Sequence, residues 1–131
     1  MTAASEIDIP EVKAEVEVVF ALYEAALVGN DVATLEALFQ DDPRTLRYGV
    51  GENLYGMDEI RAFRRGRAPQ GLERRLEKTQ ITTYGRDLAV ANTLFRRESA
   101  PRKIGRQSQT WIRFADGWKV VSAHVSVIEE G

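Results

Sequence analysis

The residues best suited to chemistry in this chain are tyrosine, arginine, glutamine and one histidine, because the sequence contains no cysteine. Without thiols the chain has neither a disulfide framework nor a thiolate nucleophile or ligand. His124 is the only histidine, and no Asp or Glu lies two or four residues from it, so we expect no metal and no cofactor. Ser122 and Ser126 flank His124, but no G-x-S-x-G motif is present to support a serine nucleophile. What remains is anion binding by arginine, with proton transfer by tyrosine or histidine.

Positive charge is concentrated in the middle of the chain. Residues 44–113 hold 16 of the 18 Lys and Arg residues and 7 of the 20 Asp and Glu residues, which is an excess of nine positive charges. The rest of the chain holds 2 and 13, an excess of eleven negative charges, so the overall value of -2 hides a sharp division. A basic middle segment favours an anionic ligand. The alternative is a solvated basic sheet edge that faces an acidic neighbour.

Tyr23 belongs to a predicted helix. Asp8 is a candidate cap for its first turn, Pro10 fits that turn, and Gly29 ends the helix. Apolar side chains recur at helical spacing at Val12, Val16, Val19, Phe20, Tyr23 and Leu27. Tyr23 is therefore on the buried stripe, one turn from the end. It is either a core tyrosine with a hydrogen-bonded hydroxyl or a phenol directed into a cavity.

Arginines at special positions form the second candidate set. Arg47 lies between apolar neighbours in a strand predicted over residues 44–50. It is either an edge charge or a buried anion clamp, because arginine is buried readily only when its guanidinium is paired. A third helix, predicted over residues 57–67, places Arg64 and Arg67 on the same face as Ile60.

The tail of the chain, residues 105–127, predicts two long strands joined by a tight turn at Ala115-Asp116-Gly117. Alternation places Gln107 and Gln109 on one face of the first strand. On the second strand it gives one face to Trp118, Val120, Ser122, His124 and Ser126, and the other to Val121, Ala123, Val125 and Val127. Apolar residues on both faces, with polar groups toward one end, are typical of a cavity wall.

The element order predicts an α+β fold. A short second helix begins at Asn30 and stops before Pro43, and further strands are predicted over residues 72–84 and 88–98. Helices followed by long antiparallel strands indicate three helices packed on one face of a curved sheet. We expect one such domain over residues 8–131, after a flexible lead-in over residues 1–7. Both sheet faces carry apolar residues but the helices can cover only one, so we expect a homodimer through the sheet.

Other classes of protein fit the sequence poorly. No apolar run approaches a membrane span, and the acidic N-terminus lacks the basic region of a signal peptide, so we expect a cytoplasmic protein without a membrane partner. Residues 61–75 contain six arginines, but the chain is net acidic and has few aromatics for stacking, so we expect no nucleic-acid partner. A ketosteroid-type isomerase would need a carboxylate base in an apolar cavity, whereas the predicted inward faces offer arginine and glutamine.

Several sequence strings resemble known families. The tyrosine-bearing first helix, GMDEIRAF and GRQSQTWIRFADGWKVVSAHVS resemble the SnoaL-like branch of the cone-shaped fold shared by ketosteroid isomerase and nuclear transport factor two. The tail is also similar to the association domain of calcium/calmodulin-dependent kinase. Through TLRYG, FRRGRAP and GRQSQTWIR, residues 8–128 are similar to the AtzH-like (HpxZ-like) proteins of cyanurate and oxalurate catabolism. The resemblance implies a cone-shaped α+β domain.

The AtzH-like resemblance implies a decarboxylating amidohydrolase that converts 1,3-dicarboxyurea to allophanate in cyanuric acid catabolism. The tyrosine and arginine implicated in that activity fall on Tyr23 and Arg47. Arg47 would then clamp the dianionic substrate and stabilise charge, and Tyr23 would transfer a proton, because a nearby arginine favours the phenolate.

The residues themselves suggest further contacts to such a substrate, and other functions stay open. Arg64 and Arg67 would assist Arg47, and polar contacts are expected from Gln107, Gln109 and Ser126, with His124 as the reserve acid or base. One alternative is a non-catalytic module for small-anion binding or assembly, as the similarity to the kinase association domain allows. The other is a relative that acts in oxalurate catabolism.

Overall fold

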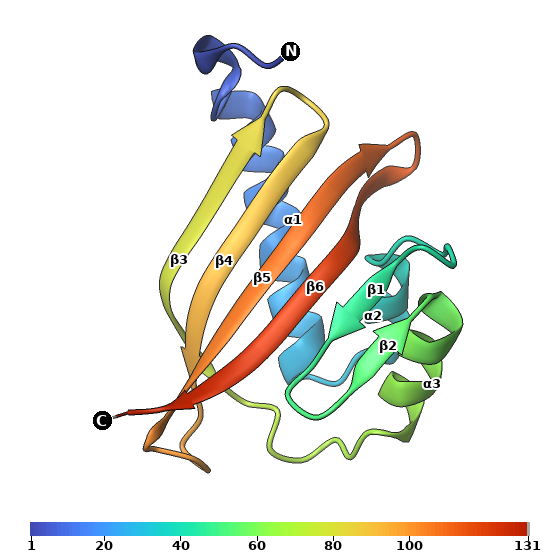
Figure 1. Ribbon diagram of the computed structural model, residues 1–131, viewed down its shortest axis with the longest axis vertical. Helices are drawn as coiled ribbons and strands as arrows, with labels where there is room; N and C mark the ends of the chain where they lie inside the picture. The colour runs from blue at the N-terminus through green and yellow to red at the C-terminus, as the bar shows by residue number, and fades with distance from the viewer. Residues whose placement is uncertain (131) are drawn as a thin grey trace.

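The computed structural model describes residues 1–130. Its elements in chain order are η1 (Ala4–Glu6), α1 (Pro10–Val28), α2 (Val32–Ala37), β1 (Leu46–Tyr48), β2 (Asn53–Tyr55), α3 (Met57–Gly66), β3 (Arg75–Tyr84), β4 (Leu88–Arg96), β5 (Lys103–Phe114) and β6 (Gly117–Glu129). The strands form one sheet in the order β2-β1-β6-β5-β4-β3. Figure 1 shows α1 behind the long strands, with α2 and α3 at the β1–β2 end. The predicted α+β class is confirmed, but the short strand β2 was not predicted from the sequence.

The sheet is antiparallel except where β1 lies parallel to β6. This pairing inserts the short β1–β2 hairpin beside the last strand, although 76 positions separate Leu46 from Ser122 in the first β1–β6 pair. It places Arg47 opposite Ala123, in the interior of the sheet. Strands from the two halves of the chain therefore meet where the candidate site lies.

Helix α1 packs its apolar stripe on the sheet as predicted. Val12, Val16, Phe20 and Tyr23 are all buried, and they join one core cluster with the inward residues of the strands. This cluster includes the fully buried Trp111 of β5. Tyr23 is thus fixed by the same packing that positions the helix.

The start of α1 differs from the prediction. The helix begins at Pro10, and the predicted cap Asp8 makes no cap hydrogen bond to it. Instead the Asp8 carboxylate accepts a hydrogen bond of 2.9 Å from the Thr83 N–H. Just before it, Ile7 forms an isolated bridge with Tyr84. These contacts connect the segment before α1 to the end of β3.

A bulge in β6 changes which residues face the helices. Thr110 pairs with Ser122, but Trp111 pairs with Val120, so Val121 is an extra residue on β6. An inserted residue moves every later side chain to the opposite face. Trp118 and Val120 are buried before the bulge, and Ala123 and Val125 are buried after it. The single alternation predicted along this strand is therefore wrong, and His124 and Ser126 lie on the outer face.

The outer face of the sheet is not covered by any helix within residues 1–130 (Figure 1). Half-buried Val90 and Ile112 lie on this face, and Tyr55 and Ile128 are exposed on it. Pairing of this face with a second copy stays a prediction. In the same residue range, no helix is long and apolar enough to cross a membrane.

Candidate active site

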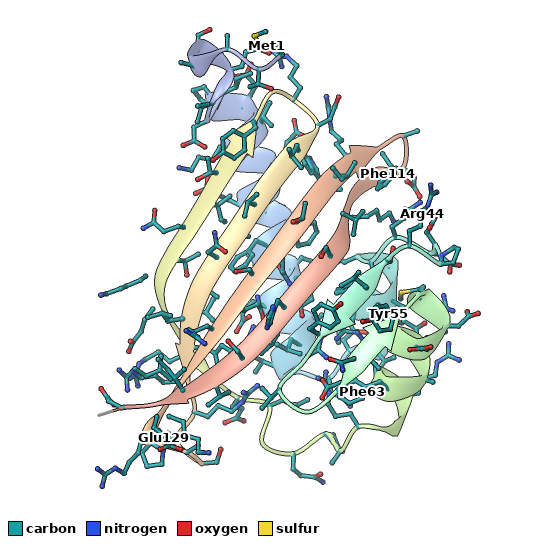
Figure 2. The ribbon with its side chains drawn as sticks, viewed as in Figure 1. Met1, Arg44, Tyr55, Phe63, Phe114 and Glu129 are labelled. Carbon is teal, nitrogen blue, oxygen red and sulfur yellow. The ribbon has the colours of Figure 1, made fainter. Side chains whose placement is uncertain are left out.

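A cavity of about 200 Å³ lies beside the C-terminal half of α1. It is bounded by α3, by β1, by the C-terminal ends of β4 and β6, and by the N-terminal part of β5 between them. Its walls are formed by Tyr23, Leu27, Arg47, Val50, Glu52, Phe63, Arg67, Leu72, Arg74, Phe95, Arg97, Gln107 and Val125. Phe63 of α3, labelled in Figure 2, belongs to the wall on the β1–β2 side. Four of these residues are arginines and one is a glutamate, so the cavity is strongly positive.

Tyr23 forms part of the cavity floor and is only 2% exposed. Its ring packs edge-on against Trp111, with 6.4 Å between centroids, and lies 6.2 Å from the Phe39 ring. Burial raises the pKa of the Tyr23 hydroxyl, but the charges of Arg64, Arg47 and Arg74 together lower that pKa below its ordinary value of 10.0. The site therefore favours the phenolate more than water does.

Arg47 is buried in the sheet with its side chain 9% exposed, so the edge-charge interpretation is wrong. Its Nη1 donates a 2.7 Å hydrogen bond to Oε1 of Glu52, in the turn between β1 and β2. Gly49 makes room for this pair, since a Cβ there would overlap the Glu52 carboxylate. The Arg47 Nε has no partner within residues 1–130, which leaves that N–H unused.

Arg64 is not among the residues that line the cavity, but it acts on Tyr23 and is only 1% exposed. Its guanidinium lies over the Phe39 ring, 4.7 Å from the centroid. None of its three side-chain nitrogens donates a hydrogen bond to residues 1–130, so Arg64 lowers the Tyr23 pKa chiefly through its positive charge. A buried charge without partners is costly, which indicates a role other than stability.

Arg67 follows α3 and lies beside Arg47. The two guanidinium groups are 5.8 Å and 5.5 Å from the centroid of the same ring, Phe63. Burial lowers the pKa of Arg67, and the positive charges of Arg64 and Arg47 lower it further, to about 10. An anion bound here would relieve the repulsion among these three residues.

Arg74 was not among the predicted site residues, yet its side chain is only 2% exposed. It precedes β3 and donates to both Glu24 oxygens, at 2.9 and 2.6 Å, and to Gln107 Oε1 at 3.0 Å. Glu24 lies on α1, directly after Tyr23. No local sequence signal pairs positions 24 and 74, so sequence reasoning missed both residues.

Arg97, also missed, comes directly after β4. Its guanidinium lies 4.9 Å from the centroid of Phe95, and that of Arg74 lies 4.5 Å from the same ring. Arg97 is half-buried, and its Nε finds no acceptor in the described part of the chain. Burial and the neighbouring Arg74 lower the pKa of Arg97.

Gln107 and Gln109 point inward as predicted, and both are buried. Gln107 lines the cavity. Gln109 does not line it, but its Oε1 accepts a 3.1 Å hydrogen bond from the Trp111 indole N–H. The Nε2 groups of both glutamines lack acceptors among residues 1–130. Gln107 therefore has a free donor beside the cavity, and Gln109 holds the ring that packs on Tyr23.

His124 and Ser126 do not join the other predicted residues. His124 is exposed on the outer face, with its ring 5.8 Å from that of Tyr48. Ser126 accepts a 3.1 Å hydrogen bond from Arg106 Nε on the same face. The bulge in β6 removes both from the cavity, which contradicts their predicted place in the substrate site. Across the described chain, no three His, Asp or Glu side chains form a group that could hold a metal ion.

Known structures place this fold among the cystatin-like proteins that include nuclear transport factor two-like members. One such protein of unknown function, from Pseudomonas putida, superposes with a TM-score of 0.76 at 18% identity, covering 96% of this chain and 89% of its own. The chain belongs to the AtzH-like family, whose model matches residues 5–131.

Two solved structures are much more similar in sequence. A protein of unknown function from Pectobacterium atrosepticum is 51% identical, with a TM-score of 0.96 and coverage of 98% of this chain and 100% of its own. A cystatin-like fold protein from Burkholderia xenovorans is 44% identical, with a TM-score of 0.92 and coverage of 96% and 98%. No curated protein matches the chain.

Proposed function

We propose that this protein is a decarboxylating amidohydrolase that converts 1,3-dicarboxyurea, a small urea-derived dicarboxylate, to allophanate. The observation that carries the proposal is a buried phenol, Tyr23, with a lowered pKa among arginines in a positive cavity. Membership of the AtzH-like family supports the choice of substrate class. In this proposal Arg47 clamps the substrate and stabilises charge, and Tyr23 transfers the proton.

Substrate binding would use the unpaired guanidinium N–H groups. Arginine binds carboxylates with two parallel hydrogen bonds, and Arg47 still has a free buried Nε next to the cavity. Arg67 adds two unpaired nitrogens, Nε and Nη2. The Gln107 Nε2 is a neutral donor suited to the urea carbonyl oxygen.

The reaction removes one terminal carboxyl group from the substrate. The bond between that carboxyl carbon and the urea nitrogen breaks, its electron pair stays on the nitrogen, and carbon dioxide leaves. The nitrogen takes a proton from the Tyr23 hydroxyl. A water molecule then returns a proton to the phenolate, and the hydroxide that it leaves combines with the carbon dioxide as bicarbonate, so each turnover consumes one water. The surrounding arginines stabilise the phenolate that forms. Proton transfer contributes about 10²–10⁴ in rate, and charge stabilisation at the carbonyl adds about 10²–10³.

The test is formation of allophanate and carbon dioxide from freshly generated 1,3-dicarboxyurea. We expect the wild type to exceed the spontaneous rate and both Tyr23→Phe and Arg47→Ala to lose at least about a hundred-fold. Tyr55→Phe is the matched control, because Tyr55 is 56% exposed and lies on the outer face. A wild-type rate equal to the spontaneous one would refute the proposal, and a fully active Tyr23→Phe variant would refute the role of Tyr23.

One observation favours a non-catalytic alternative. Glu52, the only carboxylate lining the cavity, is already paired with Arg47, so the described cavity offers no free carboxylate base or nucleophile. A small-anion-binding module would need only the arginines. Binding of malonate by calorimetry without turnover of 1,3-dicarboxyurea would support that alternative, and turnover of oxalurate instead would support an oxalurate-catabolism relative.

A further inference from the structure

Two phenylalanine rings in the cavity wall each contact two guanidinium groups. We name the first set the α3 cluster (Phe63, Arg47 and Arg67) and the second the β4 cluster (Phe95, Arg74 and Arg97). All six residues line the same cavity. The first cluster comes from β1 and the end of α3 with the residue after it. The second comes from the end of β4 with the residue after it and from the segment before β3. The positive charge of the cavity is therefore divided between two sets of residues.

In each cluster one arginine forms no ion pair with a carboxylate of residues 1–130. In the α3 cluster Glu52 pairs with Arg47, and in the β4 cluster Glu24 pairs with Arg74. Arg67 and Arg97 form no ion pair with any of residues 1–130, and both have buried guanidinium N–H groups without acceptors. A ligand with one carboxylate can neutralise only one of these two arginines. Two carboxylates on one ligand would neutralise both.

We infer that the cavity recognises a ligand with two separate carboxylates, and that Arg97 is the specificity-determining residue for the second one. Arg47 and Arg67 receive the first carboxylate. Arg97 receives the second, because Arg74 is already held by Glu24 and Gln107. The inference rests on the proposed function for its choice of cavity, but it concerns binding and does not require turnover.

The backbone of β5 fixes the β4 cluster against the sheet. Gly105 lies directly under the Phe95 ring, where a Cβ would overlap the ring carbons. The ring therefore lies close to the β5 backbone, and Arg74 and Arg97 lie over it. Such preorganisation lowers the entropic cost of holding a long arginine side chain ready for a ligand. It distinguishes Arg97 from a freely moving surface arginine.

The experiment compares each dicarboxylate with its own monomethyl ester by isothermal titration calorimetry of the full chain. The probes are malonate and succinate, which keep two carboxylates but have no carbamate bond to break. In the wild type we expect the better dicarboxylate to bind roughly ten- to hundred-fold more tightly than its monoester, as one charge-assisted pair provides. In Arg97→Gln that ratio should fall to about one while monoester binding is unchanged.

Two further variants keep this test decisive. Arg97→Lys retains the charge and should restore part of the preference, which a merely misfolded site would not do. Arg106→Gln removes an exposed arginine from the outer face of the sheet and should leave the ratio unchanged. An Arg97→Gln variant that binds the dicarboxylate within two-fold of wild type would overturn the inference, as would a wild type that binds ester and dicarboxylate equally.

The outcome separates the two proposals. A dicarboxylate preference that depends on Arg97, without turnover of 1,3-dicarboxyurea, would uphold the second carboxylate site and refute the hydrolase. Turnover of 1,3-dicarboxyurea with an unchanged KM in Arg97→Gln would uphold the hydrolase and refute the role of Arg97.

Discussion

The Arg64 guanidinium carbon lies 4.7 Å from the centre of the Phe39 ring, at a position that is 1% exposed. No side chain or carbonyl of the described chain accepts its N–H groups. Replacing buried charge by an apolar side chain of similar volume is often stabilising, by about 1–4 kcal/mol. We therefore expect Arg64→Met to raise the free energy of unfolding, measured in urea, and to lower turnover at least ten-fold because Tyr23 loses its strongest cationic neighbour.

Arg65 provides the matched control for Arg64. It is the next residue of α3, but it is exposed and pairs with Glu36 on the surface at 3.0 Å. Arg65→Met should leave turnover unchanged and alter stability by no more than about 1 kcal/mol, as is usual for an exposed ion pair. A less stable Arg64→Met variant with unchanged turnover would show that Arg64 serves packing.

The lowered pKa of Tyr23 predicts a distinct spectroscopic titration. The wild-type minus Tyr23→Phe difference in tyrosinate absorbance should show one group that ionises below the ordinary pKa of 10.0. Turnover that uses the Tyr23 proton should fall as the pH rises through that folded-state value. A difference spectrum that titrates at or above 10.0 would contradict the role given to the arginines.

Stability provides an independent check on the same pKa. The folded-state pKa lies below the unfolded value, so phenolate formation stabilises the fold. That contribution is fully present above the unfolded value, about 10, and is lost as the pH falls through the folded-state pKa. The difference in unfolding free energy between wild type and Tyr23→Phe should therefore grow with rising pH in this window. A flat difference would contradict the prediction.

The part of the site carried by regular periodicity could be predicted from the sequence. The helical stripe placed Tyr23 inside, and the helical face shared with Ile60 placed Arg64 inside. Arg47 was a candidate because arginine is buried in the interior of a strand chiefly when its guanidinium group is paired with an anion. Each of these signals lies within one element, where side-chain direction follows directly from sequence spacing.

The remaining part depends on contacts between distant segments. Arg74 is buried because Glu24, 50 positions away, reaches it, and its own neighbours look like an exposed edge. His124 was placed on the wrong face because one bulge, at Val121, interrupts the alternation. Locating a bulge requires the residue pairing between the two strands, and the sequence of β6 alone does not give its pairing with β5.

Glu52 should weaken anion binding in the cavity, because it competes with a bound carboxylate for Arg47. A ligand carboxylate must share Arg47 with Glu52, whose Oε1 accepts from Nη1 at 2.7 Å. Glu52→Gln keeps an oxygen for that hydrogen bond but removes the negative charge. We expect malonate to bind roughly two- to five-fold more tightly in calorimetry, because Glu52 is partly exposed and its charge is screened. Weaker binding would mean that Glu52 is needed to orient Arg47.

Gly105 predicts a stability effect linked to the cavity. In Gly105→Ala the new Cβ would overlap the Phe95 ring, so the ring must move. Such overpacking costs about 1–3 kcal/mol and would also displace the two guanidinium groups over that ring. Gly66→Ala is the control, because a Cβ at this helical position meets no atom and should stabilise by about 0.4–1 kcal/mol. Equal stability of the two variants in urea would contradict the close approach.

The outer face of the sheet predicts the oligomeric state. Val90 and Ile112 lie on this face, and no helix of residues 1–130 packs over them (Figure 1). Apolar side chains at the centre of an uncovered sheet are stabilised when a second copy of the face covers them. We expect sedimentation velocity at micromolar concentration to give a species of about twice the 14.7 kDa chain mass.

Val90→Lys tests whether that face forms the dimer. A lysine at this position would bring two like charges together in a symmetric interface and should shift the protein to the monomer. Glu17→Lys is the control, because it changes an exposed charge on α1, on the opposite side of the sheet (Figure 1). A Val90→Lys variant that remains dimeric would place the contact elsewhere, and a monomeric wild type would show that the half-buried outer face is stable in water. Because the anion cavity lies on the helix side of the sheet, a monomeric Val90→Lys variant should still bind malonate.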